Sequence, residues 1–408
     1  MRILLVTNTL PYPPISGFPL RVYSLLQRIA RNHEVWLVSL VTDTPDPENI
    51  SHLRTLCREV LITTTPKYGG FDKPKEWLSY SLAGIPPDLR FYRSDFMIAA
   101  IRDLVSNIDF DIIQIEDSYM ARYIEALPDD INSKTVLTFH DIVFEKYDRI
   151  FKLESKPIRK LRRWLHSRMM RSWEPHYAER FDLCITMSER DRSLLLDVNP
   201  RLHVEVVPNG VDTQTLQLLP YDDLSPGLIF VGNMSYLPNI DAILYLYEEI
   251  LPYIKRVIPN IEVWVVGIDP SPALEKLNEH GVHVTGRVDN VQPYYKRSSV
   301  CVIPLRAGGG TRLKILESMA LGRPVVSTTI GCEGLDVEDG KHLFIADAAD
   351  EFAEKVLLLL ANKEKRQQII NNARRLVETH YNWDILANKY IAALVHIIND
   401  LGHRGSIT

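Results

Sequence analysis

Short runs of apolar residues, many of them β-branched, alternate along the chain with longer segments in which apolar residues recur every three or four positions. In the first half these runs lie at residues 3–7, 35–41, 60–64, 112–115, 135–139, 183–187 and 204–207. In the second half they lie at residues 228–231, 263–266, 282–285, 300–305, 324–328 and 343–345. Short strands that alternate with helices are typical of βαβ units and parallel sheets. The pattern therefore predicts two α/β domains with doubly wound parallel sheets.

The domain boundary is expected near the turn Pro208, Asn209 and Gly210, which begins a loose, turn-rich stretch that we interpret as a linker to residue 226. The predicted domains span residues 1–207 and 208–382. Apolar residues at helical spacing in 383–401 predict a final helix, within 383–408, that packs back on the first domain. Open α/β sheets bind ligands at the carboxyl ends of their strands, so we expect the site in a cleft between the two sheets.

Composition and charge narrow the possible functions. A chain of 408 residues is long enough for two domains, and its 46% hydrophobic and 24% charged residues suit packed cores rather than disorder. The net charge of -5 argues against a nucleic-acid partner. Four widely spaced cysteines without a CxxC pair are expected to be reduced core residues: Cys57, Cys184, Cys301 and Cys332.

The N-terminal apolar run is too short for a signal peptide, and no stretch approaches the ~18 apolar residues of a membrane-spanning helix. We therefore expect a cytoplasmic protein. A Rossmann dehydrogenase is disfavoured because no GxGxxG motif follows the first strand.

The segment after the strand at 300–305 is the richest in candidate chemistry. It combines cations, glycines and a threonine at a predicted strand-to-helix junction: Arg306, Gly308, Gly309, Gly310, Thr311, Arg312 and Lys314. Glycines allow a ligand to approach the backbone, and unpaired N–H groups at a helix start bind anions. Cations in a first helical turn oppose the helix dipole, and a bound phosphate would reverse that effect. The segment predicts a diphosphate site, the alternative being a tight turn flanked by solvated charges.

Three further residues are candidates for the same ligand. Glu317 could accept hydrogen bonds from a ribose diol, and a salt bridge to Lys314 is compatible both with that role and with a purely structural one. Gly17, in the loop after the first strand, could turn backbone N–H groups toward a phosphate, or could belong to a proline-stiffened surface turn. His140 ends a strand beside Asp141 and is either structural or part of the active site.

These motifs resemble those of the retaining GT-B glycosyltransferases of family 4, in which a glycine loop and a helix lead to a glutamate that binds ribose. The matching residues are Glu317, Ser318, Met319, Ala320, Gly322, Pro324, Val325 and Val326. Related signals run from Pro13 to Arg21, from Phe139 to Asp141, from Val207 to Asp212 and from Phe230 to Gly232. The resemblance implies a GT-B fold of two Rossmann-like domains facing a central cleft, a nucleoside diphosphate sugar donor, most often a UDP- or GDP-sugar, and a place for His140 near the transferred sugar.

Two positions depart from the family pattern. Gly309 replaces a glutamate that touches the donor sugar. Gly232 and Asn233 are candidates for donor binding, but the family usually has arginine at the place of Asn233, and Pro238 and Asn239 stand near the place of a lysine. Our hypothesis is that three cations from the other loop, Arg306, Arg312 and Lys314, supply the missing charge.

With cationic side chains on the leaving diphosphate, no metal ion or other cofactor would be required. The pair Asp109 and Asp111 resembles a metal-binding Asp-x-Asp motif, but it precedes the strand at 112–115 and so lies at the wrong end of the sheet. We expect no metal at this pair.

A basic segment between the strands at 135–139 and 183–187 suggests an acceptor or membrane contact. Its cations are Lys156, Arg159, Lys160, Arg162, Arg163, Arg168 and Arg171, interleaved with Leu161, Trp164, Leu165, Met169 and Trp173. Apolar residues at spacings of three and four predict an amphipathic helix with a cationic surround, which suits an anionic membrane or a lipid-linked acceptor. The alternative is a helix packed on its domain with a solvated basic face.

Together these features predict transfer of a sugar from a nucleoside diphosphate sugar to a hydroxyl of a glycan or lipid-linked acceptor. The resemblance implies retention of configuration and a role in bacterial surface polysaccharide or glycolipid biosynthesis, in the cytoplasm or at the inner face of the plasma membrane. Two alternatives remain: a sugar-nucleotide epimerase of the same fold, and a catalytically inactive nucleotide-sugar-binding homologue.

Overall fold

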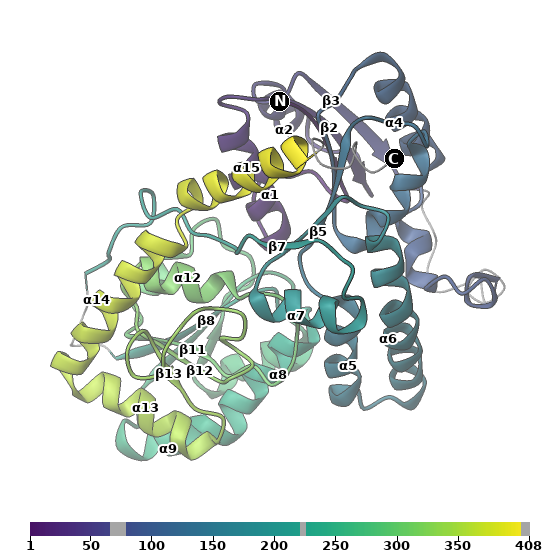
Figure 1. Cartoon of the computed structure of the whole chain (residues 1–408). Helices are drawn as coiled ribbons and strands as arrows, with labels where there is room; N and C mark the ends of the chain where they lie inside the picture. The colour runs from purple at the N-terminus through teal and green to yellow at the C-terminus, as the bar shows by residue number, and fades with distance from the viewer. Residues whose placement is uncertain (66–78, 221–225, 401–408) are drawn as a thin grey trace. The chain divides into compact units, whose positions relative to one another are not determined.

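The computed structural model describes residues 1–65, 79–220 and 226–400. Residue contacts group the chain into two compact units (Figure 1). One unit comprises Met1–Asp148, Ile158–Pro208 and the chain from Leu386, and the other comprises Arg149–Pro157 and Asn209–Ile385. The grouping of Arg149–Pro157 with the second unit was not predicted. Each unit is built around its own parallel sheet.

The first unit has seven strands in the described part of the chain. They are β1 (Arg2–Thr7), β2 (Glu34–Val41), β3 (Glu59–Thr64), β4 (Ile112–Glu116), β5 (Lys134–Phe139), β6 (Leu183–Thr186) and β7 (Val204–Val206). The connecting helices are α1 (Gly17–Ile29), α2 (Pro47–Arg54), η1 (Pro87–Tyr92), α4 (Asp95–Asn107), η2 (Ser118–Ala126), α5 (Val143–Leu153), α6 (Pro157–Ala178) and α7 (Glu189–Val198). The sheet order is β3-β2-β1-β4-β5-β6-β7, and every pair is parallel.

The second unit repeats this architecture. Its strands are β8 (Gly227–Val231), β9 (Glu262–Val266), β10 (Val282–Val284), β11 (Val300–Ile303), β12 (Val325–Ser327) and β13 (Phe344–Ile345). Its helices are α8 (Leu237–Tyr245), the π-helical turn η3 (Leu246–Ile250), α9 (Leu251–Val257), α10 (Pro272–Glu275), η4 (Lys276–His280), α11 (Gln292–Lys296), α12 (Leu313–Ala320), α13 (Ala349–Ala361) and α14 (Lys363–His380). The parallel sheet has the order β10-β9-β8-β11-β12-β13.

These two sheets confirm the predicted fold class. All thirteen strands expected from the apolar runs occur in the described chain, with ends displaced by at most two residues. Strands of this kind are buried on both faces because helices cover both, which is why their sequences are almost continuously apolar. In β1, for example, Ile3, Leu4, Leu5 and Val6 are all buried.

The final helix, α15 (Trp383–Asn399), begins in the second unit and continues into the first from Leu386. Its buried residues Leu386, Tyr390, Leu394 and Ile397 recur at spacings of four, four and three, as a helix packed along one face requires. The predicted return of the C-terminal helix to the first domain is therefore confirmed.

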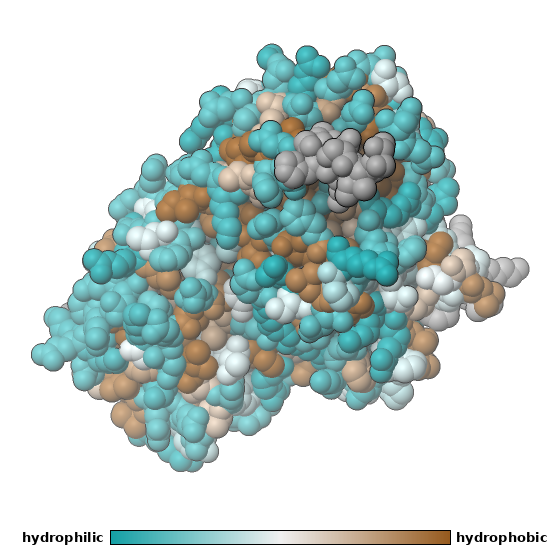
Figure 2. All heavy atoms as spheres, in the orientation of Figure 1, coloured by the Kyte–Doolittle hydropathy of each residue, from teal (hydrophilic) through white to brown (hydrophobic). Residues whose placement is uncertain are grey.

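Hydrophilic residues cover most of the face shown in Figure 2, with hydrophobic residues in smaller patches between them. The four cysteines are all buried and free, as expected. Within the described ranges, no helix has both the length and the apolar content needed to cross a bilayer.

Candidate active site

Strand order reverses between β1 and β4 in the first sheet and between β8 and β11 in the second. Ligands of open α/β sheets bind at the carboxyl ends of the strands at such reversals. The loop that leads to Gly17 follows β1, and His140 follows β5, next to β4. Gly232 and the glycine loop Gly308–Gly310 follow β8 and β11. Each sheet thus carries predicted site residues at its expected edge.

His140 is paired with a carboxylate that the sequence did not reveal. Its Nε2 lies 2.7 Å from Oε2 of Glu116, the last residue of β4. The other oxygen of Glu116 accepts a hydrogen bond of 2.6 Å from Nε2 of Gln114. The side chains of His140 and Glu116 are 15% and 4% exposed, so the histidine is the member of the pair that reaches solvent.

A buried arginine, Arg21, interacts with the Glu116 carboxylate of this pair. Arg21 is buried and donates hydrogen bonds to the carbonyl oxygens of Val207 and Pro208 at 2.9 and 2.7 Å. Burial lowers the pKa of Arg21 to about 10, although the charge of Glu116 opposes that change. Burial alone would raise the pKa of Glu116, but His140, Arg21 and Gln114 together bring it below its ordinary value. Glu116 is therefore an anion at neutral pH.

Phe18, the second residue of α1, packs its ring on His140. The ring centroids are 4.3 Å apart with an interplanar angle of 39°. Gly17 is the first residue of α1, so its backbone N–H belongs to the unpaired donors of a helix start. The Phe18 contact therefore places the start of α1 close to His140.

Asp117, directly after Glu116, has an unusual backbone. Its φ of 83° and ψ of 132° fall in a region that residues other than glycine rarely occupy. Its carboxylate accepts hydrogen bonds from Nδ2 of Asn8 at 2.8 Å and from the N–H of Tyr119 at 3.2 Å. Burial raises the pKa of Asp117 to about 6. Backbone strain of this kind costs about 1–3 kcal/mol and often marks a functional site.

In the second unit, the glycine loop wraps around the Arg312 side chain. Gly308 and Gly310 have φ values of 117° and 69°. The φ of Gly308 favours glycine, and a methyl group there would lie 2.8 Å from an Arg312 guanidinium nitrogen and displace it. The same guanidinium donates hydrogen bonds to the carbonyl oxygens of Gly309 and Gly310. Arg312 is the N-cap residue of α12 rather than a member of its first turn, which corrects the predicted helix start by one residue.

Lys314, in the first turn of α12, extends to the loop after β8. Its Nζ lies 3.2 Å from Oδ1 of Asn239 and 3.9 Å from the centre of the Phe230 ring. A methyl group on Gly232 would approach that Nζ to 2.8 Å, so this glycine gives the ammonium group its space. The cation therefore occupies the neighbourhood of Gly232 and Asn239, where the family usually has its lysine.

Burial, with a further contribution from the charge of Arg312, lowers the pKa of Lys314 to about 7. Burial also raises the pKa of Glu317 to about 7, while Lys314 opposes that change. The Lys314 ammonium group contacts Asn239, and its interaction with Glu317 is one of charge without an ion-pair contact among the described residues. The Glu317 carboxylate forms no hydrogen bond with any residue that the structure describes. It is therefore available to a ligand.

Thr311 is held by a residue of the domain-junction motif. Nδ2 of Asn209 donates a hydrogen bond of 2.7 Å to Oγ1 of Thr311, and both side chains are buried. A hydroxyl that accepts one hydrogen bond still has its own proton to donate. This contact fixes the end of the glycine loop and the direction of the Thr311 hydroxyl.

Two predicted donor-binding side chains are used elsewhere. Arg306 forms a bidentate pair with Asp241, at 2.9 and 2.7 Å, and lies over the Tyr245 ring. Its predicted role in neutralising the diphosphate therefore loses its support, because a carboxylate already compensates its charge. Oδ1 of Asn233 caps the backbone N–H of Ser235, so that side chain stabilises the local turn.

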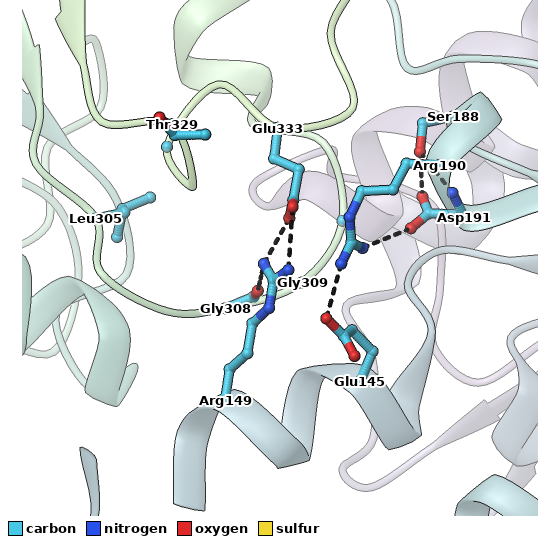
Figure 3. A network of polar contacts seen from close by, with 12 residues as sticks. Glu145, Arg149, Ser188, Arg190, Asp191, Leu305, Gly308, Gly309, Thr329 and Glu333 are labelled. Atoms are coloured by element: carbon cyan, nitrogen blue, oxygen red, sulfur yellow. Dashed lines mark hydrogen bonds and ion pairs between the residues drawn. The ribbon is translucent and has the colours of Figure 1, made fainter. Parts of the chain in front are cut away.

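The glycine loop also contacts α5. Arg149, in the part of α5 that groups with the second unit, donates to the Gly308 carbonyl at 3.3 Å. It also binds both oxygens of Glu333, at 2.5 and 3.0 Å. Figure 3 shows the Arg149 side chain directed at both partners. The bidentate pair with Glu333 holds the Arg149 guanidinium group in place. Arg149 in turn holds the Gly308 carbonyl group of the glycine loop.

The segment Ser188 to Asp191, for which the sequence indicated no role, begins α7. Oγ of Ser188 accepts the backbone N–H of Asp191 at 3.1 Å, which is an N-cap. Arg190 binds Glu145 of α5 at 2.7 Å (Figure 3). The segment therefore joins α7 to α5.

The basic segment forms α6, and its two halves differ. The C-terminal half is in the core, where Met170 and Trp173 are buried. In the N-terminal half Ile158, Leu161 and Trp164 are 77%, 57% and 39% exposed, although they follow one another at spacings of three. Arg159 and Lys160 are exposed, while Arg162 and Arg163 are half-buried. The predicted apolar stripe is therefore buried in the C-terminal half of α6, and in the N-terminal half it forms an exposed apolar patch among cations.

Asp111 accepts a hydrogen bond of 2.6 Å from the backbone N–H of Arg2, at the amino end of its strand. Among the described residues, no three histidine, cysteine, aspartate or glutamate side chains gather as a metal site would require.

Two family models match the chain. The model described as Glycosyltransferase Family 4 matches residues 15–215, and the one described as Glycosyl transferases group 1 matches residues 225–362. An uncharacterized 44.6 kDa protein in the cps region of Klebsiella pneumoniae is 21% identical over 395 residues, which cover 93% of this chain and 96% of that protein. The lipopolysaccharide 1,2-N-acetylglucosaminetransferase of Salmonella typhimurium is 24% identical, over 58% of this chain and 67% of that protein.

Solved structures share the whole fold at low identity. Sucrose-phosphate synthase from Thermosynechococcus elongatus matches with a TM-score of 0.74 and 17% identity, over 98% of this chain and 100% of that one. The Anabaena protein HepE, in complex with UDP-glucose, matches with a TM-score of 0.67 and 15% identity, over 97% of this chain and 99% of that one.

Proposed function

Because this chain belongs to the family 4, group 1 glycosyltransferases, we propose that it transfers a sugar from a nucleoside diphosphate sugar to a hydroxyl of a glycan or lipid-linked acceptor. The observation that carries the proposal is the position of Lys314, whose Nζ lies beside Gly232 and Asn239 at the strand reversal of the second sheet. A partly desolvated ammonium group next to a helix start and a glycine loop is a strong diphosphate ligand.

In this proposal the diphosphate lies between Lys314 and Arg312 at the start of α12. The helix N–H groups and the Thr311 hydroxyl donate to the phosphate oxygens, and the Glu317 carboxylate accepts hydrogen bonds from the ribose diol. Donor binding also removes the unfavourable interaction between Lys314 and the helix dipole. A metal ion would not be needed for charge, because two cations already face the leaving group.

Retention of configuration completes the proposed reaction. The bond from the anomeric carbon to the diphosphate breaks, and its electron pair goes to the phosphate oxygen. The acceptor oxygen bonds to the same face of the carbon, and its proton passes to the departing phosphate. Catalysis of this kind depends on positioning and on charge stabilisation of the leaving group. His140 would contact a hydroxyl of the transferred sugar.

The donor is tested by titration calorimetry of UDP, GDP, ADP and TDP with EDTA present. We expect one nucleotide to bind at least tenfold more tightly than the others, since a base pocket discriminates through a few contacts, each worth about 1 kcal/mol or more. HepE was solved with UDP-glucose, which favours a UDP-sugar. If none of the four binds without metal, the proposed donor site is wrong.

Turnover separates the transferase from the two alternatives. An epimerase would convert the nucleotide sugar without an acceptor, and an inactive homologue would bind it without converting it. The relatives in a cps region and in lipopolysaccharide synthesis favour a surface polysaccharide or glycolipid acceptor.

The N-terminal half of α6 supports a contact with an anionic membrane at the inner face of the plasma membrane. Ile158, Leu161 and Trp164 are exposed together, and Arg159 and Lys160 are exposed beside them. Apolar side chains that enter the lipid interface and cations that bind anionic headgroups reinforce one another. A lipid-linked acceptor would be met at such a surface.

Liposome pelleting tests this contact. We expect the protein to sediment with vesicles that contain phosphatidylglycerol and to stay in solution with phosphatidylcholine alone. Replacing Ile158, Leu161 and Trp164 together by serine should reduce the bound fraction at least tenfold, because each buried apolar side chain contributes about 1.5–3 kcal/mol. The matched control is Val257→Ser on α9, which is 66% exposed and should change nothing. Equal binding to both vesicles would refute the membrane contact.

A further inference from the structure

Glu116 is a buried carboxylate whose hydrogen bonds are directed at the site. Oε2 lies 2.7 Å from Nε2 of His140, and Oε1 accepts the 2.6 Å hydrogen bond from Gln114. Gln114 is fully buried and is itself held by the Thr138 hydroxyl at 2.7 Å. A carboxylate buried at the end of an apolar strand is costly unless its charge is used or compensated. Arg21 and His140 compensate the charge of Glu116, and the hydrogen bonds of the network fix its carboxylate against the histidine.

The network determines which nitrogen of His140 carries the proton. An ionised carboxylate only accepts hydrogen bonds, so the short contact to Oε2 requires an N–H at Nε2. A neutral imidazole has a single N–H, and Nδ1 is then left with a lone pair. Nδ1 forms no hydrogen bond with any residue that the structure describes. Its lone pair is therefore free to accept a proton from a ligand hydroxyl in a hydrogen bond.

The ring orientation is fixed as well as the tautomer. The Phe18 ring packs on the imidazole with centroids 4.3 Å apart, and His140 directly follows the last residue of β5. The positive charge of Arg21 lowers the pKa of Glu116 and so helps to keep the carboxylate ionised. The imidazole is thus held on one face and at one nitrogen, and only its other nitrogen is unoccupied.

We propose that Glu116 is a positioning residue, which holds His140 in the Nε2–H tautomer and directs the Nδ1 lone pair at a substrate hydroxyl. The inference rests on the proposed transferase function and specifies how its histidine is prepared. It also assigns a purpose to Gln114, which orients Glu116 by occupying the other carboxylate oxygen.

Long-range ¹H–¹⁵N NMR of the imidazoles tests the tautomer directly at pH 8. The His140 signals are identified by their loss in His140→Gln. We expect Nε2 to be protonated and Nδ1 unprotonated in the wild type. In Glu116→Gln the new amide should keep its oxygen toward Gln114 and present its NH₂ group to His140, which inverts the tautomer. A wild-type His140 protonated at Nδ1 would overturn the inference.

Turnover of the selected nucleotide sugar provides the second test, by transfer or by hydrolysis without acceptor. We expect Glu116→Gln and His140→Gln each to lower kcat about 100-fold and to leave the nucleotide Kd within twofold. The double variant should be no slower than His140→Gln, because Glu116 acts through the histidine. Glu125→Gln, an exposed carboxylate on η2, is the matched control and should keep full activity.

Additive losses in the double variant, or a Glu116→Gln enzyme within threefold of the wild type, would reject the positioning role. The NMR result does not depend on turnover. An inactive wild type with the Nε2–H tautomer would therefore contradict the proposed function, whereas an active wild type with the other tautomer would contradict this inference alone.

Discussion

Replacing both Arg312 and Lys314 by alanine should weaken binding of the selected nucleoside diphosphate at least 100-fold. Each cation contributes a charge-assisted hydrogen bond worth about 1.5–3 kcal/mol, and the pair therefore accounts for about two to four orders of magnitude in affinity. Turnover should fall further, since the same charges stabilise the leaving diphosphate. Calorimetry and initial rates of the double variant measure the two effects.

The fold should survive this double substitution. Lys314 lies partly buried in the first turn of a helix, where a cation is unfavourable, so its removal relieves a cost in the unliganded protein. We expect the melting temperature to stay within a few degrees of the wild type. Arg306→Ala is the matched control, because Asp241 already binds that guanidinium and nucleotide affinity should change less than threefold. Nucleotide binding within threefold of wild type in the double variant would eliminate the proposed diphosphate site.

Nucleotide affinity should be greatest near pH 7 and fall on both sides. The pKa of Lys314 is lowered to about 7, so the ammonium group that binds the diphosphate is lost as the pH rises through that value. The pKa of Glu317 is raised to about 7, so the carboxylate that accepts the ribose hydroxyls is lost as the pH falls through it. On each limb of this profile, above and below pH 7, the nucleotide affinity should fall by up to about tenfold per pH unit, as expected for one linked proton.

Two conservative variants assign the limbs of this profile. Lys314→Arg keeps its charge at every accessible pH, so its affinity should stay constant above pH 7. Glu317→Gln should lose the acidic limb and move the alkaline limb to lower pH, because the carboxylate supports the ammonium charge of Lys314. The nucleotide's own ionisation is common to all variants and cancels in the comparison. A wild-type affinity that is constant from pH 6 to 9 would contradict the assignment.

The fold was predictable from the chain because its signals are local. Each strand buried on both faces is a short apolar run, and the helices between strands carry their own periodicity. The glycine loop was equally visible, since Gly308 and Gly310 adopt φ values that favour glycine. What the resemblance added was the identity of the ligand.

The partners of the charged residues were not predictable, because they come from distant parts of the sequence. Asp241 precedes Arg306 by 65 residues, and Asn239 precedes Lys314 by 75. Asp241 and Asn239 both lie on α8. The packing of α8 near the loop after β11 therefore decides that a carboxylate compensates Arg306, whereas Lys314 meets an uncharged amide. Glu116 was concealed for another reason: it ends an apolar run that has the composition of a core strand.

The backbone of Asp117 has a consequence for how this enzyme can vary. An aspartate held where glycine would be relaxed costs the folded state about 1–3 kcal/mol, a noticeable part of the 5–15 kcal/mol that typically separates folded from unfolded domains. Glycine at this position would raise the free energy of unfolding, yet it would remove a carboxylate from the edge of the sheet where His140 lies. Relief of the backbone strain and retention of the carboxylate that binds Asn8 therefore place opposite demands on residue 117.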